Sequence, residues 1–395
     1  MKNRPCWVET DTQALEDNYR FLASLATPDV ELLAVVKANA YGHGLALCAP
    51  AVMRGGARWL GVTTVEEGVE ARAACPDAEI LVISGVFPGQ GEAVVRHKLT
   101  PAVWEPWQLD ELEQAIQAAP DAAPLKVHLE IDTGMSRQGV TPDQVAAILP
   151  RIQSSKGLQL DGIMTHLFAA DEADGRITER QMVELERALK PVAEAGIHPT
   201  WLNAGSSAAL VAGRAAEIAK LAAKHGMKAM MRPGLVLYGL VPKFFPAFIG
   251  EEPTSLKAAR KALRPALTWK TQVATVRTVG PGALVGYNGT YVATEPMQLA
   301  MLAVGYADGL KRRLSNNFSL LIHGRRAPIV GRISMDQTMI DVTAIEAVKP
   351  GDEVAILGEQ GGQRISAEEH ALPLGTISWE IFTSIGARVE RIPRP

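Results

Sequence analysis

Short apolar runs alternate with amphipathic stretches along the first part of this chain, and that alternation constrains the fold most strongly. An apolar run is typical of a parallel strand buried on both faces, and apolar residues three and four apart indicate a covering helix. The apolar runs lie at residues 32–37, 59–63, 80–84, 101–103, 126–131, 160–165, 200–203 and 229–232. About eight strand-then-helix units over roughly 230 residues predict a closed (β/α)8 barrel. A doubly wound open sheet is the alternative, but the GxGxxG turn that would normally follow its first strand is absent.

The pattern changes beyond the eighth run. Residues 242–265 are first rich in proline and phenylalanine and then become basic and helical. From Ala266 onward, strand-like segments are separated by turn dipeptides. These predicted strands cover residues 267–279, 298–304, 318–322, 327–333, 338–342 and 353–357. The sequence therefore predicts a barrel over residues 1–245, a connecting segment over 246–265 and a mainly β domain over 266–395.

Composition narrows the class of protein. The chain has 395 residues, 47% of them hydrophobic, and a net charge of −3, which predicts no general affinity for nucleic acid or acidic membranes. The three cysteines are scattered without a CxxC pair, and no HExxH pattern occurs, so we expect no metal site and a reducing compartment. The first residues lack an apolar signal core, and no window is apolar and long enough to span a bilayer. We expect a cytoplasmic protein.

The first apolar run ends in Lys37, which is followed by the small-residue segment Ala-Asn-Ala-Tyr41-Gly-His-Gly. A lysine at the carboxyl end of a parallel strand lies where α/β proteins place their chemistry. Desolvation there lowers the pKa of the amine and makes it a nucleophile or base. By position alone, Lys37 could equally be a side chain that extends from a strand end into solvent.

Seven motifs, that segment included, resemble the alanine racemase family, and they occur in the family's order. They are VVKANAYGHG from Val35, EIDTGMSRQG from Glu130, MTH from Met164, RPGLVLYG from Arg232, VGYNGTY from Val285, GYADG from Gly305 and GRISMDQ from Gly331. The resemblance covers nearly the whole chain. It implies an N-terminal (β/α)8 TIM-type barrel, a C-terminal mainly β domain, pyridoxal 5'-phosphate (PLP) as cofactor and a homodimer.

The resemblance also implies the catalytic groups. Lys37 would bind PLP covalently and act as one base, and Tyr287 would act as the second acid/base across the dimer interface. Without the motif, Tyr287 would be interpreted as an aromatic residue of a half-buried strand. Arg232 would lie against the pyridine nitrogen, and because an arginine keeps its proton, that nitrogen would stay unprotonated.

The remaining site residues are assigned by the same motifs. The cofactor would also be held by Tyr41, His166, Asn203, Ser207, Gly234, Leu235 and Trp379. The substrate carboxylate would bind Arg137 and the backbone amide of Met335, with Tyr306 lining the pocket. Supporting positions would be Glu130, Asp171, Arg312, Arg332 and Asp336.

Three positions depart from the family's pattern. Glu130 stands where members often have a lysine that carries a carbamate, and we expect its carboxylate to orient Arg137 instead. Asn203 replaces a histidine that would support Arg232. Trp379 replaces a tyrosine, and since indole can donate but not accept a hydrogen bond, phosphate contact and pocket shape would change.

The most consistent interpretation is a two-base racemase that converts L-alanine to D-alanine, a precursor of peptidoglycan. Because of Trp379, a serine or broad-specificity racemase is the alternative. A PLP-dependent decarboxylase of diamino acids shares the predicted architecture, but Arg232 argues against it. A non-catalytic PLP carrier would not need the β domain with Tyr287.

Overall fold

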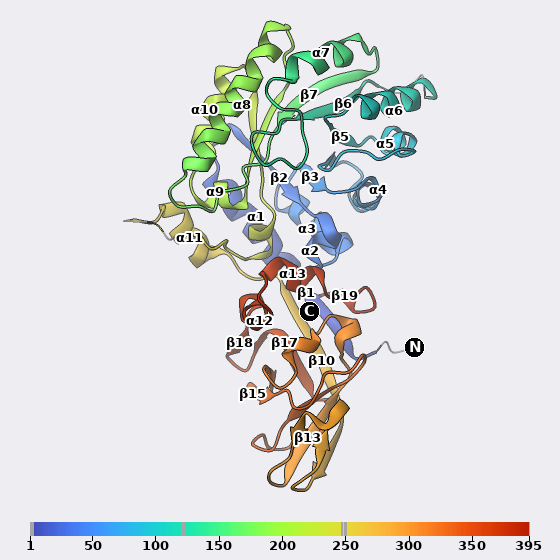
Figure 1. Cartoon of the computed structure of the whole chain (residues 1–395), viewed down its shortest axis with the longest axis vertical. Helices are drawn as coiled ribbons and strands as arrows, with labels where there is room; N and C mark the ends of the chain where they lie inside the picture. The colour runs from blue at the N-terminus through green and yellow to red at the C-terminus, as the bar shows by residue number, and fades with distance from the viewer. Residues whose placement is uncertain (1–3, 120–122, 246–247, 249–250, 395) are drawn as a thin grey trace. The chain divides into compact units, whose positions relative to one another are not determined.

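Eight parallel strands close into a barrel in the computed structural model, which describes residues 4–119, 123–245, 248 and 251–394 (Figure 1). Each strand pairs in parallel with the next, and the last pairs back onto the first. The strands are β2 (Val30–Val35), β3 (Trp59–Val62), β4 (Glu79–Val82), β5 (Thr100–Val103), β6 (Leu125–Glu130), β7 (Leu158–Met164), β8 (Trp201–Ser206) and β9 (Lys228–Arg232). All eight apolar runs are strands, which confirms the predicted barrel.

Helices follow the barrel strands and cover their outer surface (Figure 1). They are α1 (Thr12–Leu25), α2 (Lys37–Tyr41), α3 (Leu45–Arg54), α4 (Val65–Ala74), α5 (Gly91–Arg96), α6 (Pro106–Gln117), α7 (Val145–Ser154), α8 (Arg176–Glu194), α9 (Ser207–Val211), α10 (Ala215–Lys224), the 3-10 turn η1 (Leu235–Tyr238) and α11 (Thr254–Ala262). The longest, α8, buries Leu185 and Leu189 on one face and ends before Gly196, whose φ of +66° terminates helices readily. Among the described residues, no helix is both long and apolar enough to cross a bilayer.

The rest of the chain forms a mainly β unit. Its largest sheet has the order β15-β14-β17-β10-β1-β19, with β13 paired to β10, β16 paired to β13 and β18 paired to β17. The elements are β1 (Cys6–Thr10), β10 (Leu267–Val279), β11 (Leu284–Val285), β12 (Tyr291–Val292), β13 (Met297–Leu302), β14 (Ser319–Ile322), β15 (Arg325–Pro328), β16 (Thr338–Asp341), β17 (Glu353–Gln360), β18 (Gln363–Ile365), β19 (Glu390–Pro393), α12 (Ala367–Leu374), α13 (Ser378–Thr383), η2 (Tyr287–Gly289), η3 (Tyr306–Asp308) and η4 (Arg312–Leu314). Trp269 on β10 is among its largest fully buried side chains.

Each of the two compact units consists of more than one segment of the chain. The β unit contains the N-terminal segment up to Thr12, the segment Tyr41–Leu47 and the chain from Ala266, and the barrel unit contains Gln13–Ala40 and Cys48–Pro265. Strand β1 is therefore a central strand of the β unit, antiparallel to β10 and parallel to β19. Residues 246, 247, 249 and 250 of the expected connecting segment lie outside the described residues, and α11 lies within that segment.

Several predicted strands end one or more residues earlier than the apolar pattern indicated, and in two of them the backbone shows the reason. The first barrel strand ends at Val35 rather than at Lys37, because the backbone turns into a left-handed conformation there. The strand predicted over 327–333 was too long, since β15 ends at Pro328 and Gly331, with a φ of +75°, breaks the extended run.

Candidate active site

Lys37 begins a rare piece of backbone at the carboxyl end of β2. The four residues that follow it, Ala38 to Tyr41, all have φ between +51° and +54°. Left-handed geometry costs an L-residue roughly 1–2 kcal/mol. The Ala40 N–H donates to the Val36 carbonyl over 2.8 Å, which closes this turn. Such strain in non-glycine residues is typical of functional sites, where the surrounding structure holds it in place.

The environment of Lys37 makes its amine a stronger nucleophile than a surface lysine. Burial lowers the pKa of Lys37, and the positive charges of Arg137 and Arg232 lower it further. The carboxylate of Glu67 acts in the opposite direction. A lowered pKa increases the fraction of neutral amine, which is the form that attacks a carbonyl or accepts a proton.

Arg232 is the last residue of β9 and is held rigidly among buried groups. Its Nη1 donates to the Asn203 carbonyl over 2.9 Å and also to the Asn203 side-chain oxygen, and its Nη2 donates to the Thr165 carbonyl over 2.7 Å. Burial lowers the pKa of Arg232 to about 10, so the guanidinium remains charged at neutral pH. Asn203 thus supports Arg232 by accepting a hydrogen bond through its amide oxygen.

Glu130, at the end of β6, is buried and hydrogen-bonded to its own loop. Its Oε2 accepts from Gln138 Nε2 over 2.7 Å, and the same nitrogen donates to the Ile83 carbonyl over 3.1 Å. Burial raises the pKa of Glu130, opposed by the Gln138 hydrogen bond and by the charges of Arg232 and Arg137. Arg137 itself is exposed in the loop after β6. Within the described chain, the contact between Glu130 and Arg137 is electrostatic rather than a hydrogen bond.

His166 follows β7 and is electrically neutral. Burial, together with the charges of Arg232, Arg137 and Lys37, lowers its pKa to about 3. A neutral imidazole next to three cationic side chains adds no further positive charge, and its flat ring is available for packing. Its backbone carbonyl accepts from Gln181 Nε2 over 2.8 Å, which ties the loop to α8.

Ser207 and Gly234 bring two polar groups together at the ends of β8 and β9. The Gly234 N–H donates to Ser207 Oγ over 2.9 Å, and Leu235 begins the turn η1 directly after it. Ser207 is the first residue of α9, and the first N–H groups of a helix have no acceptor within the helix. Backbone amides and a hydroxyl in this arrangement suit an anionic group.

Two further predicted residues are Tyr41, in the left-handed turn after β2, and Asp171, between β7 and α8. Burial raises the pKa of Tyr41 to about 12, so its phenol is protonated at neutral pH. Asp171 is exposed, and its carbonyl accepts from the Phe245 N–H over 3.1 Å.

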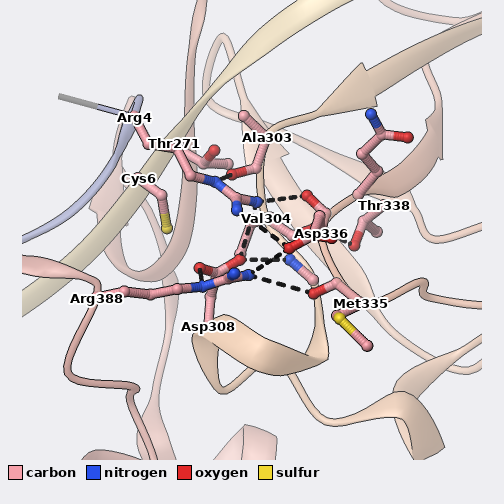
Figure 2. A network of polar contacts seen from close by, with 12 residues as sticks. Arg4, Cys6, Thr271, Ala303, Val304, Asp308, Met335, Asp336, Thr338 and Arg388 are labelled. Carbon is pink, nitrogen blue, oxygen red and sulfur yellow. Dashed lines mark hydrogen bonds and ion pairs between the residues drawn. The ribbon is translucent and has the colours of Figure 1, made fainter. Parts of the chain in front are cut away.

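Within the β unit, Tyr306 and Met335 are placed by an ionic network that Figure 2 shows. Tyr306 N–H donates to the Ser334 carbonyl over 3.0 Å, and the Ala307 N–H donates to the Met335 carbonyl over 3.1 Å. Asp308, only 1% exposed, anchors this pair of loops (Figure 2).

Asp308 has three partners. Its Oδ2 accepts from Gly305 N over 2.8 Å and from Arg4 Nη2 over 3.1 Å, and its Oδ1 accepts from Arg388 Nε over 2.7 Å. Both arginines also contact Asp336, at 3.4 Å from Arg4 Nη1 and 2.7 Å from Arg388 Nη2. Met335 and Tyr306 are themselves 53% and 41% exposed.

The other predicted residues of the β unit are at least partly accessible. Tyr287 opens the turn η2 and is 67% exposed. Arg312 is exposed on η4, and Arg332 and Trp379 are half-buried. Trp379 lies in the first turn of α13, and its carbonyl accepts from Thr383 Oγ1 over 2.9 Å.

Residues that the sequence analysis did not single out support these positions. They are Glu67 beside Lys37, Gln138 beside Glu130, and Arg4, Asp308 and Arg388 beside Met335. Gln138 and Asp308 lie within quoted motifs but were given no role there. Glu67 had a signal of its own, because Thr64-x-x-Glu67 directly after an apolar run is the pattern of a capped helix start.

The barrel carries a lysine of lowered pKa and a buried arginine at the carboxyl ends of its strands, where (β/α)8 enzymes have their active sites, and this places the protein among such enzymes. A family model described as the N-terminal domain of alanine racemase matches residues 10–242, and one for its C-terminal domain matches residues 266–393. The chain belongs to the alanine racemase family.

Relatives cover the chain almost completely. Alanine racemase of Halothermothrix orenii is 37% identical over 388 residues, which are 98% of this chain and 96% of the relative. That of Symbiobacterium thermophilum is 40% identical over 390 residues, 98% and 97% of the two chains. Among solved structures, alanine racemase from Bacillus anthracis with bound L-Ala-P has a TM-score of 0.84 and 32% identity, covering 98% and 95% of the two chains. The Bartonella henselae enzyme with covalently bound pyridoxal phosphate has a TM-score of 0.80 and 27% identity, covering 99% of both.

The barrel residues fit pyridoxal phosphate, which carries an aldehyde, a ring nitrogen and a phosphate. The lowered pKa of the Lys37 amine suits reaction with the aldehyde, and the Ser207–Gly234 pair suits the phosphate. Arg232 suits the ring nitrogen, because its hydrogen bonds within the described chain all leave from the two Nη atoms, so the Nε–H remains for a ligand.

Proposed function

We propose that this protein racemises alanine with pyridoxal phosphate as its cofactor and Lys37 and Tyr287 as its two acid/bases. The observation that carries the proposal is the placement of Lys37, with its lowered pKa, at the end of β2 beside Arg137 and Arg232. The relatives' names supply the substrate, since those that cover nearly the whole chain are alanine racemases.

The protein's own residues would divide the work as follows. The bound cofactor withdraws electrons from the substrate Cα, which makes the Cα–H bond acidic enough to break. Lys37 Nζ exchanges a proton on one face of that carbon, and Tyr287 Oη exchanges one on the other face. Tyr287 would come from a second copy of the chain in a homodimer. Its exposure of 67% leaves the phenol available for that role.

Binding and orientation fall to other side chains. Arg137 binds the substrate carboxylate with the Met335 amide, and Glu130 supplies negative charge near that arginine. Arg232 donates to the cofactor ring and cannot give up its proton, which favours plain proton exchange over decarboxylation. Ser207, Gly234 and Leu235 hold the phosphate. The cofactor site is completed by Tyr41, Trp379, Asn203 and His166. The residues that border the substrate are Tyr306, Asp171, Arg312, Arg332 and Asp336.

A chiral assay tests this function. Purified protein is incubated with L-alanine and separately with D-alanine, with and without added PLP, and the enantiomers are separated chromatographically. We expect both to reach an equal mixture only with PLP, and K37A to abolish the reaction. Y287F should block proton exchange on one face, whereas K37A removes both the covalent attachment of the cofactor and the base on the other face, so a fully active Y287F would refute the two-base assignment.

Substrate breadth is measured in the same way. A panel of L-amino acids compares kcat/KM for alanine with that for serine, because Trp379 changes the shape of the predicted pocket. We expect alanine to be preferred, and serine turnover well above alanine turnover would replace the proposal with a serine or broad-specificity racemase. Sedimentation of the holoenzyme tests the homodimer.

A further inference from the structure

Glu67 contacts the Lys37 turn without belonging to any of the seven motifs. It lies in the first turn of α4, one element beyond β3, and its carboxylate is half-buried. Its Oε1 accepts from the Ala38 N–H over 2.6 Å, and its Oε2 accepts from the Thr63 N–H over 2.7 Å. One carboxylate therefore bridges the residue after Lys37 and the residue after β3.

The register of the barrel explains why a bridge is needed here. Strands β2 and β3 pair in parallel up to Val35 and Gly61, and Val36 N–H still donates to the Gly61 carbonyl over 2.8 Å. In a regular parallel ladder, the N–H groups of Thr63 and Ala38 would supply the next rungs. The left-handed turn prevents this, because the Val36 carbonyl already accepts from Ala40. Glu67 supplies both missing acceptors.

Charge strengthens this arrangement. A carboxylate that accepts from backbone N–H groups forms shorter and stronger hydrogen bonds than a neutral acceptor does. Glu67 lies in the first turn of helix α4, where its N–H donates to Thr64 Oγ1 over 3.3 Å, while its carboxylate makes the two contacts with Ala38 and Thr63. The left-handed turn is intrinsically unfavourable, so a strong external partner at its first amide has a direct effect on where Lys37 lies.

We propose that Glu67 is a positioning residue that holds Lys37 in its reactive placement by locking the Ala38 amide. The proposal rests on the proposed role of Lys37. The charged and titratable groups acting on Lys37 are Arg137, Arg232 and Glu67, with neutral His166 nearby. Glu67 is the one negative charge among them, and it offsets part of the effect of the two arginines.

The test compares E67Q with two matched controls in the full-length protein. Glutamine keeps the length of the side chain but replaces one acceptor with an NH2 group that cannot accept from an amide. E66Q removes an exposed charge from the same helical turn, where Glu66 contacts Gln90 at 2.8 Å and not the Lys37 turn. T64A weakens the helix start and leaves the Glu67 carboxylate intact.

Amide exchange is the first readout, since it requires neither substrate nor activity. In E67Q, exchange at Ala38 should accelerate by at least about tenfold, whereas E66Q and T64A should stay within about twofold of wild type. The second readout is the pH dependence of reductive methylation of Lys37, followed by peptide mass spectrometry. Its midpoint should move to lower pH in E67Q, because a nearby negative charge is lost.

Kinetics of the holoenzyme give the third readout. A misplaced lysine should lower kcat on the order of 10- to 100-fold with little change in KM. E67D, which retains both oxygens but is shorter, should recover part of the Ala38 protection and of the methylation midpoint. The positioning role would be overturned if E67Q kept the wild-type rate of Ala38 amide exchange and the wild-type methylation midpoint of Lys37. It would also be overturned if T64A accelerated the Ala38 exchange as much as E67Q does. Absence of alanine turnover in the wild type would instead count against the proposed function and leave these first two readouts valid.

Discussion

Replacing Asp308 by asparagine should destabilise the β unit far more than the same change at Asp336, although both carboxylates contact the same two arginines. Asp308 is 1% exposed, and its Oδ2 accepts from the buried Gly305 N–H. The asparagine side chain in D308N would have one oxygen for three donors, and its NH2 would face a donor. Asp336 is 52% exposed, so water can replace its contacts when it is neutralised.

The expected magnitude follows from these exposures. A buried donor left without its charged acceptor costs about 1–3 kcal/mol. Arg4 and Arg388 are 32% and 40% exposed, so water compensates for most of each lost pairing. D308N should therefore cost about 1–3 kcal/mol, chiefly through the Gly305 N–H. D336N should cost much less, because its contacts are exposed to solvent.

Peptide-level hydrogen exchange under urea is the suitable assay. It reports the β unit separately from the barrel, which a single unfolding transition of a protein with two compact units would not. Peptides from β10 and β13 should lose protection at lower urea in D308N, while barrel peptides should not change. If D308N and D336N shifted these peptides equally, the argument from burial would be wrong. In the holoenzyme, D308N should also raise KM, because Tyr306 and Met335 lose their anchor.

Three further changes test other parts of the structure. Burial lowers the pKa of the fully buried His128 to about 3, so between about pH 6.5 and 3 the unfolded chain binds one more proton and the free energy of unfolding falls as pH falls. In acid unfolding curves, H128L should reduce this dependence on pH by up to about 1.4 kcal/mol per pH unit. An unchanged pH dependence would contradict the burial argument. G42A should lower the melting temperature strongly, since Gly42 has a φ of +78° and an added Cβ would lie 2.2 Å from the Phe382 carbonyl oxygen. G196A, where an added Cβ meets no atom within 4 Å, should cost only about 1 kcal/mol. Equal shifts of the melting temperature would show that the clash with Phe382 does not matter. E130Q should raise the KM for alanine, because Arg137 loses nearby negative charge, and steady-state kinetics identical to wild type would eliminate Glu130 as its orienting group.

The barrel was predictable from sequence because each of its strands is buried on both faces. Such strands are continuous apolar runs, and the run at residues 80–84, for example, corresponds to β4. Strand β1 was not predicted, since five residues at the chain start carry little pattern and their partner β10 is far away in sequence. The long-range pairing of β1 leaves no local signal.

The same contrast between local pattern and long-range contact holds for the site residues. Motif residues such as Lys37 and Arg232 could be named in advance, but the groups that hold them could not. The left-handed turn after Lys37 consists of alanine, asparagine and tyrosine, and only asparagine visits that conformation at all readily. Glu67 acts on the distant Ala38 amide, and Asp308 acts on the distant side chains of Arg4 and Arg388, and such contacts depend on the folded register rather than on residue type.

The position of β1 inside the C-terminal sheet has a consequence for biosynthesis. The strand leaves the ribosome before the barrel, yet its neighbours β10 and β19 are made only after the entire barrel. At synthesis rates of about 5–20 residues per second, this strand waits on the order of tens of seconds with unpaired backbone groups. A nascent chain arrested before β10 would expose it as an open edge that can pair with other chains. Ribosome stalling within the barrel should therefore produce aggregation that depends on residues 6–10, even where the barrel itself has folded.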